Sequence, residues 1–314
     1  MHQLDDGDGA ASLTHAAMVA ERAGAPSILG AMTLAHAIVR ATTPTTPDAA
    51  PSRWMLFLHG ILGSGANWRT FAKQIVSARP DWGAVLVDLR LHGESQDGFG
   101  SPHTIAAAAH DIVELISTLE AGTEVGRVRG VLGHSFGGKV ALELARQRHA
   151  DLDQLFVIDS TPSARPDGKG SESTRHIIDL LTHLPDEFPD RGAFTAWIEA
   201  QGVSRPTAMW LAMNVRPVVN TTRFVFRVDI AGIRELLADY FRVDLWGVLE
   251  EPRAPGSMQS HLIVGGKSGI VDAADREHAQ RCPNTTLDVI AEADHWVHVD
   301  APDALRTLVV GYLS

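Results

Sequence analysis

The chain has 314 residues, and 27 basic against 38 acidic side chains give it a formal net charge of −11. Apolar residues make up 45% and charged residues 21%, a composition typical of globular proteins that excludes a mainly disordered, collagen-like or coiled-coil chain. The acidic balance argues against nucleic acid as a partner. Cys282 is the single cysteine, which excludes an internal disulfide and a cysteine-rich zinc site.

The first segment, residues 1–30, is predicted to be an N-terminal extension. Its acidic start, MHQLDDGDG, lacks the basic, apolar or acid-poor features of secretory and mitochondrial targeting segments, so we expect a cytoplasmic protein. The apolar stretch 28–39 is too short and too often interrupted to span a bilayer, so no membrane span is expected. Residues 32–40 predict an early strand, and the Pro- and Thr-rich stretch 42–52 predicts a connection.

Six short apolar runs follow along the chain, and they are typical of strands that are buried on both faces of a parallel sheet. Apolar residues at helical spacing lie between them, over 104–119 and 137–147 and again over 303–313. Alternating strands and helices predict the α/β class, with a mostly parallel, doubly wound sheet. The runs are WMLFLHG, AVLVDLRLHG, VRGVLGHS, QLFVIDS, SHLIVGG and TLDVIAEADH.

The alternation stops between the fourth and fifth runs. Residues 163–257 instead hold helical patterns over 176–184, 193–200, 206–215 and 230–241, with a short extended stretch at 224–229. We therefore expect a core formed by 31–162 and 258–314, with 163–257 inserted as a helical lid. Apolar lid side chains could line an acyl site or simply pack the lid. Three polar ones could meet a polar or charged substrate group, or they could be solvated or locally bonded. The apolar ones are Phe194, Trp197, Met209, Trp210, Leu211, Met213, Phe224 and Phe226, and the polar ones are Asn214, Arg216 and Arg223.

A nucleophile is predicted at Ser135, in the G-x-S-x-G sequence of residues 133–137. The motif follows an apolar strand and opens a helix, which is the strand–turn–helix setting that this chemistry requires. Small neighbours allow the sharp turn, and amides at the helix start face a developing oxyanion. The backbone N–H groups of Phe136 and of Ile61, in the glycine-rich loop 59–68, are the expected oxyanion-hole donors.

The general base is expected on the loop after the last apolar run, where ADHW places His295. His298, three residues later, is the competing candidate. The H-x-x-H spacing of these two also occurs in metal sites, but the glutamate of an HExxH helix is missing. No metal and no cofactor are therefore expected.

The acid that orients the imidazole must lie at the carboxyl end of a strand. Asp159 ends the strand after the nucleophile helix and gives the chain order Ser, Asp, His. Asp272 is the competing candidate, although its place before AADREHAQR favours a helix N-cap. Asp88 ends an earlier strand and is expected to be structural. Ser268 stands where the acid is usual after the lid, so it could hydrogen-bond within the triad's surroundings or be an ordinary turn serine.

Taken together, FLHGILGSGANW, VDLRLHGES, GHSFGGK, VIDSTP, FVFRVD, VGGKSGIV and ADHWVH resemble the α/β-hydrolases. Within that superfamily the chain is similar to the small YbfF-type esterases and their mitochondrial α/β-hydrolase relatives, over roughly residues 32–314. The resemblance implies an acid after the strand that follows the nucleophile, which favours Asp159, and a serine at the usual acid position. It also implies a cofactor-free esterase or thioesterase for short to medium acyl chains.

The expected reaction is hydrolysis of a small acyl ester or thioester through an acyl-serine intermediate. Two different functions stay open at this point. The same three residues serve C–C bond hydrolysis or cofactor-free perhydrolysis, and the same fold serves ligand receptors without catalysis. The natural substrate, its leaving group and the oligomeric state do not follow from the sequence.

Overall fold

The computed structural model describes residues 33–41, 51–148, 150–168, 172–254 and 256–313. The N-terminal extension and most of the 42–52 connection lie outside the described residues. Seven strands form one sheet in the order β1-β3-β2-β4-β5-β8-β9, in which β1 is antiparallel to β3 and the other pairs are parallel. The strands are β1 (His36–Val39), β2 (Arg53–Leu58), β3 (Trp82–Val87), β4 (Arg127–His134), β5 (Gln154–Ile158), β8 (Gln259–Gly265) and β9 (Thr285–Ile290).

Both faces of this sheet are buried because successive side chains of a strand point to opposite sides. In β2, Leu56 and Leu58 belong to one apolar cluster, while Met55 and Phe57 belong to a second. All four are at most 1% exposed. The predicted mostly parallel sheet with two covered faces is therefore confirmed, and it explains why the strands appear in the sequence as uninterrupted apolar runs.

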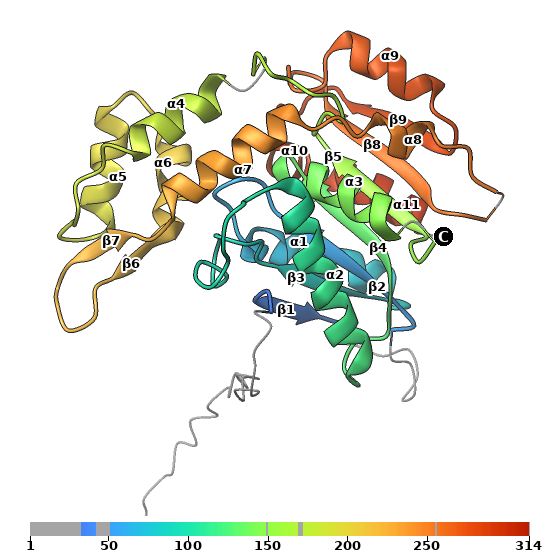
Figure 1. Ribbon diagram of the computed structural model, residues 1–314, viewed down its shortest axis with the longest axis horizontal. Coiled ribbons are helices and arrows are strands. Elements are labelled where there is room, and N and C mark those ends of the chain that lie inside the picture. The colour runs from blue at the N-terminus through green and yellow to red at the C-terminus, as the bar shows by residue number, and fades with distance from the viewer. Residues whose placement is uncertain (1–32, 42–50, 149, 169–171, 255, 314) are drawn as a thin grey trace, which may run out of the picture. The chain divides into compact units, whose positions relative to one another are not determined.

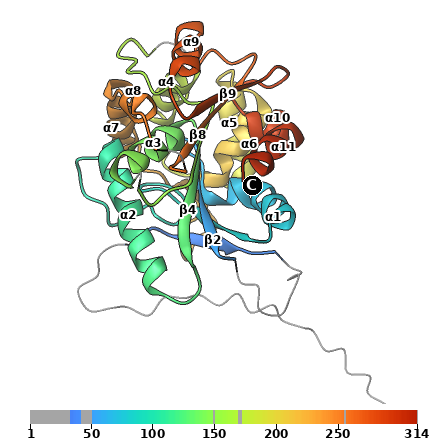
Figure 2. The ribbon, with the colours of Figure 1, turned by 90° about the vertical axis from the view of Figure 1, so that its right-hand side faces the viewer.

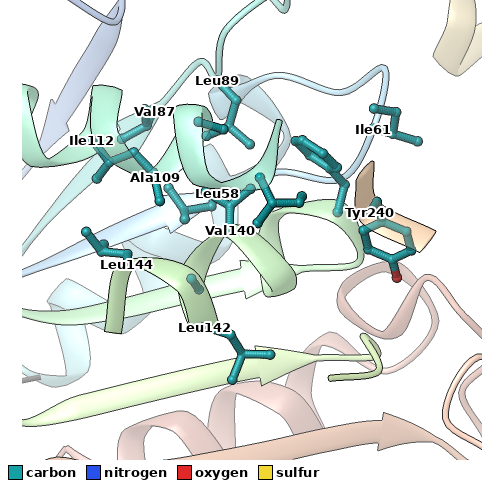
Figure 3. Packing of buried hydrophobic residues seen from close by; sticks show 14 of the residues in the cluster. Leu58, Ile61, Val87, Leu89, Ala109, Ile112, Val140, Leu142, Leu144 and Tyr240 are labelled. Atoms are coloured by element: carbon teal, nitrogen blue, oxygen red, sulfur yellow. The ribbon is translucent and has the colours of Figure 1, made fainter. Parts of the chain in front are cut away.

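Helices cover the two faces of the sheet (Figure 2). On the first face, Ile112 of α2 and Val140 and Leu144 of α3 pack against Leu58 and Val87 (Figure 3). Helices α1 and α11 contribute to the second cluster. The bounds outside the insertion are η1 (Gly65–Trp68), α1 (Arg69–Ala78), α2 (Ile105–Ala121), α3 (Phe136–Arg148), α9 (Ala273–Arg281), α10 (Val297–Asp300) and α11 (Pro302–Tyr312).

Between β5 and β8 the chain leaves the sheet, and we call residues 163–257 the inserted segment. Its helices α4, α5 and α6 and its hairpin β6–β7 form one group, and α7 leads from this group to α8 (Figure 1). An aromatic cluster packs the group internally, since Phe194 lies 5.4 Å from Phe226 and 5.3 Å from Phe188 between ring centroids. The elements are α4 (Glu172–Leu181), α5 (Arg191–Ala200), α6 (Arg205–Leu211), η2 (Ala212–Asn214), β6 (Val215–Pro217), β7 (Phe224–Phe226), α7 (Ile230–Arg242) and α8 (Trp246–Glu250).

A buried lysine on the nucleophile helix binds the first residue of the inserted segment and the end of α7. Lys139, fully buried in α3, donates from Nζ to the carbonyls of Ser163 at 2.8 Å, Tyr240 at 2.6 Å and Val243 at 2.8 Å. Burial lowers the pKa of Lys139 to about 8, because few groups besides these carbonyls replace its hydration. The segment is thus fixed to the core beside the start of α3.

Candidate active site

Ser135 lies in the turn between β4 and α3, at the carboxyl edge of the sheet. Its φ is +53°, a left-handed conformation that costs a non-glycine residue about 1–2 kcal/mol. The flanking structure holds this conformation, since the Ser135 amide donates to the Ile158 carbonyl at 3.0 Å and its carbonyl accepts from Gly138 at 2.9 Å. The strained turn presents the hydroxyl to the pocket that His295 also lines.

Two glycines of the G-x-S-x-G motif are required by close backbone contacts. A Cβ atom on Gly133 would lie 2.1 Å from the carbonyl oxygen of Gly137. A Cβ atom on Gly137 would lie 2.6 Å from the carbonyl oxygen of His59. Any larger residue at either position would therefore displace the turn or the loop after β2.

The structure brings two of the predicted residues into direct contact. Asp159 follows β5, His295 follows β9, and the Nδ1 atom of His295 lies 2.7 Å from the Asp159 Oδ2 atom. The Asp159 side chain is fully buried, whereas that of His295 is 27% exposed. An ionised carboxylate can only accept, so Nδ1 carries the proton and Nε2 keeps its lone pair. This is the tautomer that a general base needs.

Two further donors fix the Asp159 carboxylate. Ser268 donates its hydroxyl to Oδ2 at 2.6 Å, and the Gly265 amide donates to Oδ1 at 3.0 Å. Both donors come from β8 and the turn after it, which is where an acid is usual after an inserted lid. Of the two roles considered for Ser268, the structure therefore shows the hydrogen bond to Asp159.

The competing acid, Asp272, lies elsewhere. It is the N-cap of α9, where its Oδ1 atom accepts from the Asp275 amide at 3.0 Å, and it also pairs with Arg165 at 3.3 Å. The predicted N-cap is thus confirmed. Asp88 has a structural place as well, because its carboxylate accepts from the amides of Gly65 at 2.7 Å and Glu94 at 2.9 Å.

The two predicted oxyanion donors belong to the loop after β2 and to the first residue of α3. Ile61 and Ser135 both line the pocket, and Phe136 begins α3. Neither the Ile61 nor the Phe136 amide donates a hydrogen bond to another described residue outside regular secondary structure. The Ile61 loop turns tightly, since the Gly63 amide donates to the Gly60 carbonyl at 3.0 Å and Leu62 has a φ of +61°.

Hydrogen bonds to distant parts of the chain hold this loop. His59 accepts the Leu89 amide at Nε2, 3.0 Å away, so its Nδ1 carries the proton and donates to the Gly60 carbonyl at 2.8 Å. On the other side, the buried amide of Asn214 donates to the Leu62 carbonyl at 2.9 Å. The loop that carries the Ile61 amide is therefore bound by both the core and the inserted segment.

His134 is a site residue that the sequence pattern did not reveal. Its Nε2 atom lies 2.8 Å from the His295 carbonyl oxygen, so it donates there and holds the backbone of the predicted base. Burial, followed by the neighbouring His295 and His298, keeps the pKa of His134 well below its ordinary value. The sequence does place His134 directly before the serine of the motif. It does not show the partner of His134, because that partner lies 161 residues away along the chain.

Ser135 and His295 open into a pocket of about 310 Å³. The loop after β2 with Trp68 forms one wall, α4 and α6 with the turn before it form another, and the stretch from His295 to His298 forms a third. Of the eight apolar side chains considered either for the acyl site or for packing of the lid, all in the described part of the chain, Trp210 lines this pocket and the others do not. Phe194 and Leu211 are fully buried within the inserted segment, whereas Met209 is 57% and Met213 47% exposed.

The three polar side chains that could have met substrate have protein partners instead. Asn214 binds the Leu62 carbonyl, Arg216 binds the Met213 carbonyl, and Arg223 donates to Glu187 at 3.3 Å. Besides Ser135, His295 and His298, the pocket has polar lining residues that the sequence did not single out. These include Asn67, Ser173, Thr174, His176, Ser204 and Thr207.

His298 is placed neither as a metal ligand with His295 nor as the general base. Within the described residues, no three His, Cys, Asp or Glu side chains are placed to hold a metal ion. No carboxylate bonds to the His298 ring among the described contacts, and burial lowers its pKa to about 4. The geometry therefore favours His295 as the base.

The fold and this arrangement of residues are typical of one class of protein, and similarity to known proteins agrees with that class. Residues 55–308 match the alpha/beta hydrolase family, so the chain belongs to that family. A solved marine microorganism esterase has the same fold, with a TM-score of 0.73 and 18% identity over 90% of this chain and 100% of that one. Among the described helices, none is both long and apolar enough to cross a bilayer.

Two curated relatives match most of their own length. The mouse sn-1-specific diacylglycerol lipase ABHD11 is 27% identical over 83% of this chain and 80% of its own. The esterase YbfF of Escherichia coli is 25% identical over 83% of this chain and 92% of its own. The chain is accordingly an ester hydrolase, and the YbfF resemblance seen in the sequence is confirmed.

Proposed function

We propose that the protein hydrolyses carboxylic esters or thioesters of short to medium acyl chains through an acyl-serine intermediate. The observation that carries this proposal is the 2.7 Å hydrogen bond between His295 Nδ1 and the buried Asp159 carboxylate, in the pocket that holds Ser135. A pocket of about 310 Å³ lies at the small end of the usual range for ligand sites, which suits a short acyl group.

In the proposed mechanism, the Ser135 hydroxyl attacks the ester carbonyl while His295 Nε2 accepts its proton. The negative oxygen of the tetrahedral intermediate accepts hydrogen bonds from the Ile61 and Phe136 amides, each worth about 3 kcal/mol in such a site. His295 then returns the proton to the departing alcohol or thiol. A water molecule repeats the sequence on the acyl-serine, with His295 again as base and Asp159 stabilising the imidazolium.

The inserted segment is proposed to act as the lid of this site, since α4 and α6 supply part of the pocket wall. The core of 31–162 and 258–314 would then carry the chemistry and the lid would select the acyl group. The cytoplasmic location stays a prediction.

Hydrolysis of p-nitrophenyl esters from acetate to palmitate tests the proposal. We expect the highest kcat/KM of the wild-type protein at short or medium chains, and no turnover above background for Ser135→Ala. If a correctly folded wild-type protein cleaves no ester or thioester, the ester proposal fails, and C–C hydrolysis, perhydrolysis or ligand binding must be tested in its place.

A further inference from the structure

His298 differs from the other core histidines that line the pocket near the nucleophile. His59 uses both ring nitrogens inside the protein, on the Leu89 amide and the Gly60 carbonyl. His134 uses Nε2 on the His295 carbonyl. His298 also lines the pocket, yet none of the described residues accepts from or donates to its ring. Its hydrogen-bonding capacity is available to a ligand.

The ring of His298 is nevertheless held in place. Its centroid lies 4.6 Å from that of Trp68 and 4.9 Å from that of His134, and the His134 ring is inclined to it by 66°. The Nδ1 atom is shut off from solvent and has no partner, whereas Nε2 is not among the enclosed unpaired atoms. Packing therefore fixes the ring so that Nε2 is the nitrogen that a molecule in the pocket can reach.

The proton position follows from the cost of burial. A buried N–H without an acceptor is rarer in proteins than an acceptor that lacks a donor, so the enclosed Nδ1 carries the lone pair. Nε2 then carries the proton and points a donor at the pocket. The lowered pKa of His298, about 4 through burial and the neighbouring His295, agrees with a neutral ring.

We propose that His298 is a specificity-determining residue whose Nε2–H binds a second acceptor oxygen of the substrate, apart from the scissile ester. The substrate class is therefore an ester that carries an ether or further carbonyl oxygen close to the bond that is cleaved. This inference rests on the proposed ester hydrolysis. A site built around an unpaired donor discriminates against substrates that leave the donor unpaired.

The experiment compares ester pairs that differ by one CH₂-to-oxygen exchange. In the acyl arm the pair is p-nitrophenyl pentanoate and p-nitrophenyl 3-methoxypropanoate; in the alcohol arm it is butyl acetate and 2-methoxyethyl acetate. The measured quantity is the ratio of kcat/KM for the ether ester to kcat/KM for the alkyl ester, divided by the same ratio for hydroxide-catalysed hydrolysis. We expect this normalised ratio to be about five or more for the wild-type protein in at least one arm, the size of one hydrogen bond.

His298→Phe keeps a ring against Trp68 and removes the donor, so the ratio should fall about fivefold in that arm. His298→Gln returns an N–H near the position of Nε2 and should recover part of the preference. Thr207→Val is the matched control, because Thr207 also lines the pocket but its hydroxyl already bonds Ser204 at 2.9 Å, and its ratio should not change.

A normalised ratio of one or less in both arms for the wild-type protein overturns the inference even if the His298 variants do not fold. An unchanged ratio in His298→Phe, or an equal fall in Thr207→Val, overturns it too. Failure of the ester proposal is a different result, in which the wild-type protein cleaves neither member of either pair, or Ser135→Ala cleaves them equally well.

Discussion

The sheet core and the inserted segment differ in how their residues are held. In the core, Ser135, Asp159 and His295 follow three parallel strands, and backbone hydrogen bonds to neighbouring strands fix the first two, at 3.0 and 2.8 Å. The inserted segment has its own aromatic cluster and joins the core through separate polar contacts, among them those of Lys139 and Asn214. The residues proposed to react thus follow strands of the sheet, while a part of the pocket wall lies on a separately packed unit.

The two regions also differ in the burial of their histidines. His176 and His183 of the inserted segment are exposed. In the core, burial lowers the pKa of His59, His261 and His298 to about 4 and that of His92 to about 3. The core therefore contains several imidazoles that must stay neutral for the fold to persist.

The largest expected effect is acid unfolding that starts in the core. These histidines have ordinary pKa values near 6.5 when unfolded, so the unfolded chain binds more protons between pH 6.5 and 4. The neutral histidines contribute their full share of the unfolding free energy above pH 6.5. Each group loses about 1.4 kcal/mol of it per pH unit below that value, and the contribution is lost as the pH falls through 4. Urea unfolding at a series of pH values gives the unfolding free energy as a function of pH. Its slope in this range should correspond to the uptake of more than two protons on unfolding. A flat unfolding free energy across this range would contradict the buried neutral histidines.

The second effect separates the two candidate acids. Asp159→Asn leaves the geometry in place but favours the wrong His295 tautomer, so kcat should fall about 10³- to 10⁴-fold. Asp272→Asn keeps an N-cap oxygen but loses the charge that pairs with Arg165, so it should lower stability by at most about 1 kcal/mol without a comparable loss of kcat. Ester hydrolysis and urea unfolding of both variants measure this. Loss of activity in Asp272→Asn alone would move the acid to α9.

The third effect concerns the attachment of the inserted segment. Lys139→Met leaves the carbonyls of Ser163, Tyr240 and Val243 without their buried donor, so the unfolding free energy should fall by about 2–4 kcal/mol. Lys73→Met, at an exposed position of α1, is the control and should change stability by less than about 0.5 kcal/mol. If the two variants are equally stable, Lys139 is not the anchor of the inserted segment.

The smallest effect concerns the contact from the inserted segment to the loop 59–68, which carries the Ile61 amide. Asn214→Leu removes the donor to the Leu62 carbonyl and should loosen the turn that carries the Ile61 amide, lowering kcat about tenfold with little change in KM. Met213→Ala, at the exposed neighbouring position, should keep both constants. An unchanged kcat in Asn214→Leu would show that the core alone holds the loop.

The core could be predicted because its signals are local. Continuous apolar runs follow from burial on both faces, and the glycines at 133 and 137 follow from atoms within a few residues or on the adjacent loop. Ser135 and His295 could be placed because each directly follows a run of this kind. The antiparallel pairing of β1 was not predicted, since its partner strand is not specified by the run itself.

The pocket could not be predicted to the same extent because its contacts are long-range. Helical spacing shows that Phe194 and Trp210 are apolar positions, but it does not show which of them faces the segment's own core and which faces the pocket. Likewise His134 and Asn214 bond residues 161 and 152 positions away. Such pairings depend on how the two regions pack, and no local pattern records them.

The most direct test of the central claim is covalent labelling with a fluorophosphonate, followed by mass analysis of the peptides. The account predicts one adduct per chain, on Ser135, with a labelling rate that falls by orders of magnitude in His295→Ala. An adduct on another residue, or an equal rate in His295→Ala, would contradict the claim that Asp159 and His295 activate Ser135.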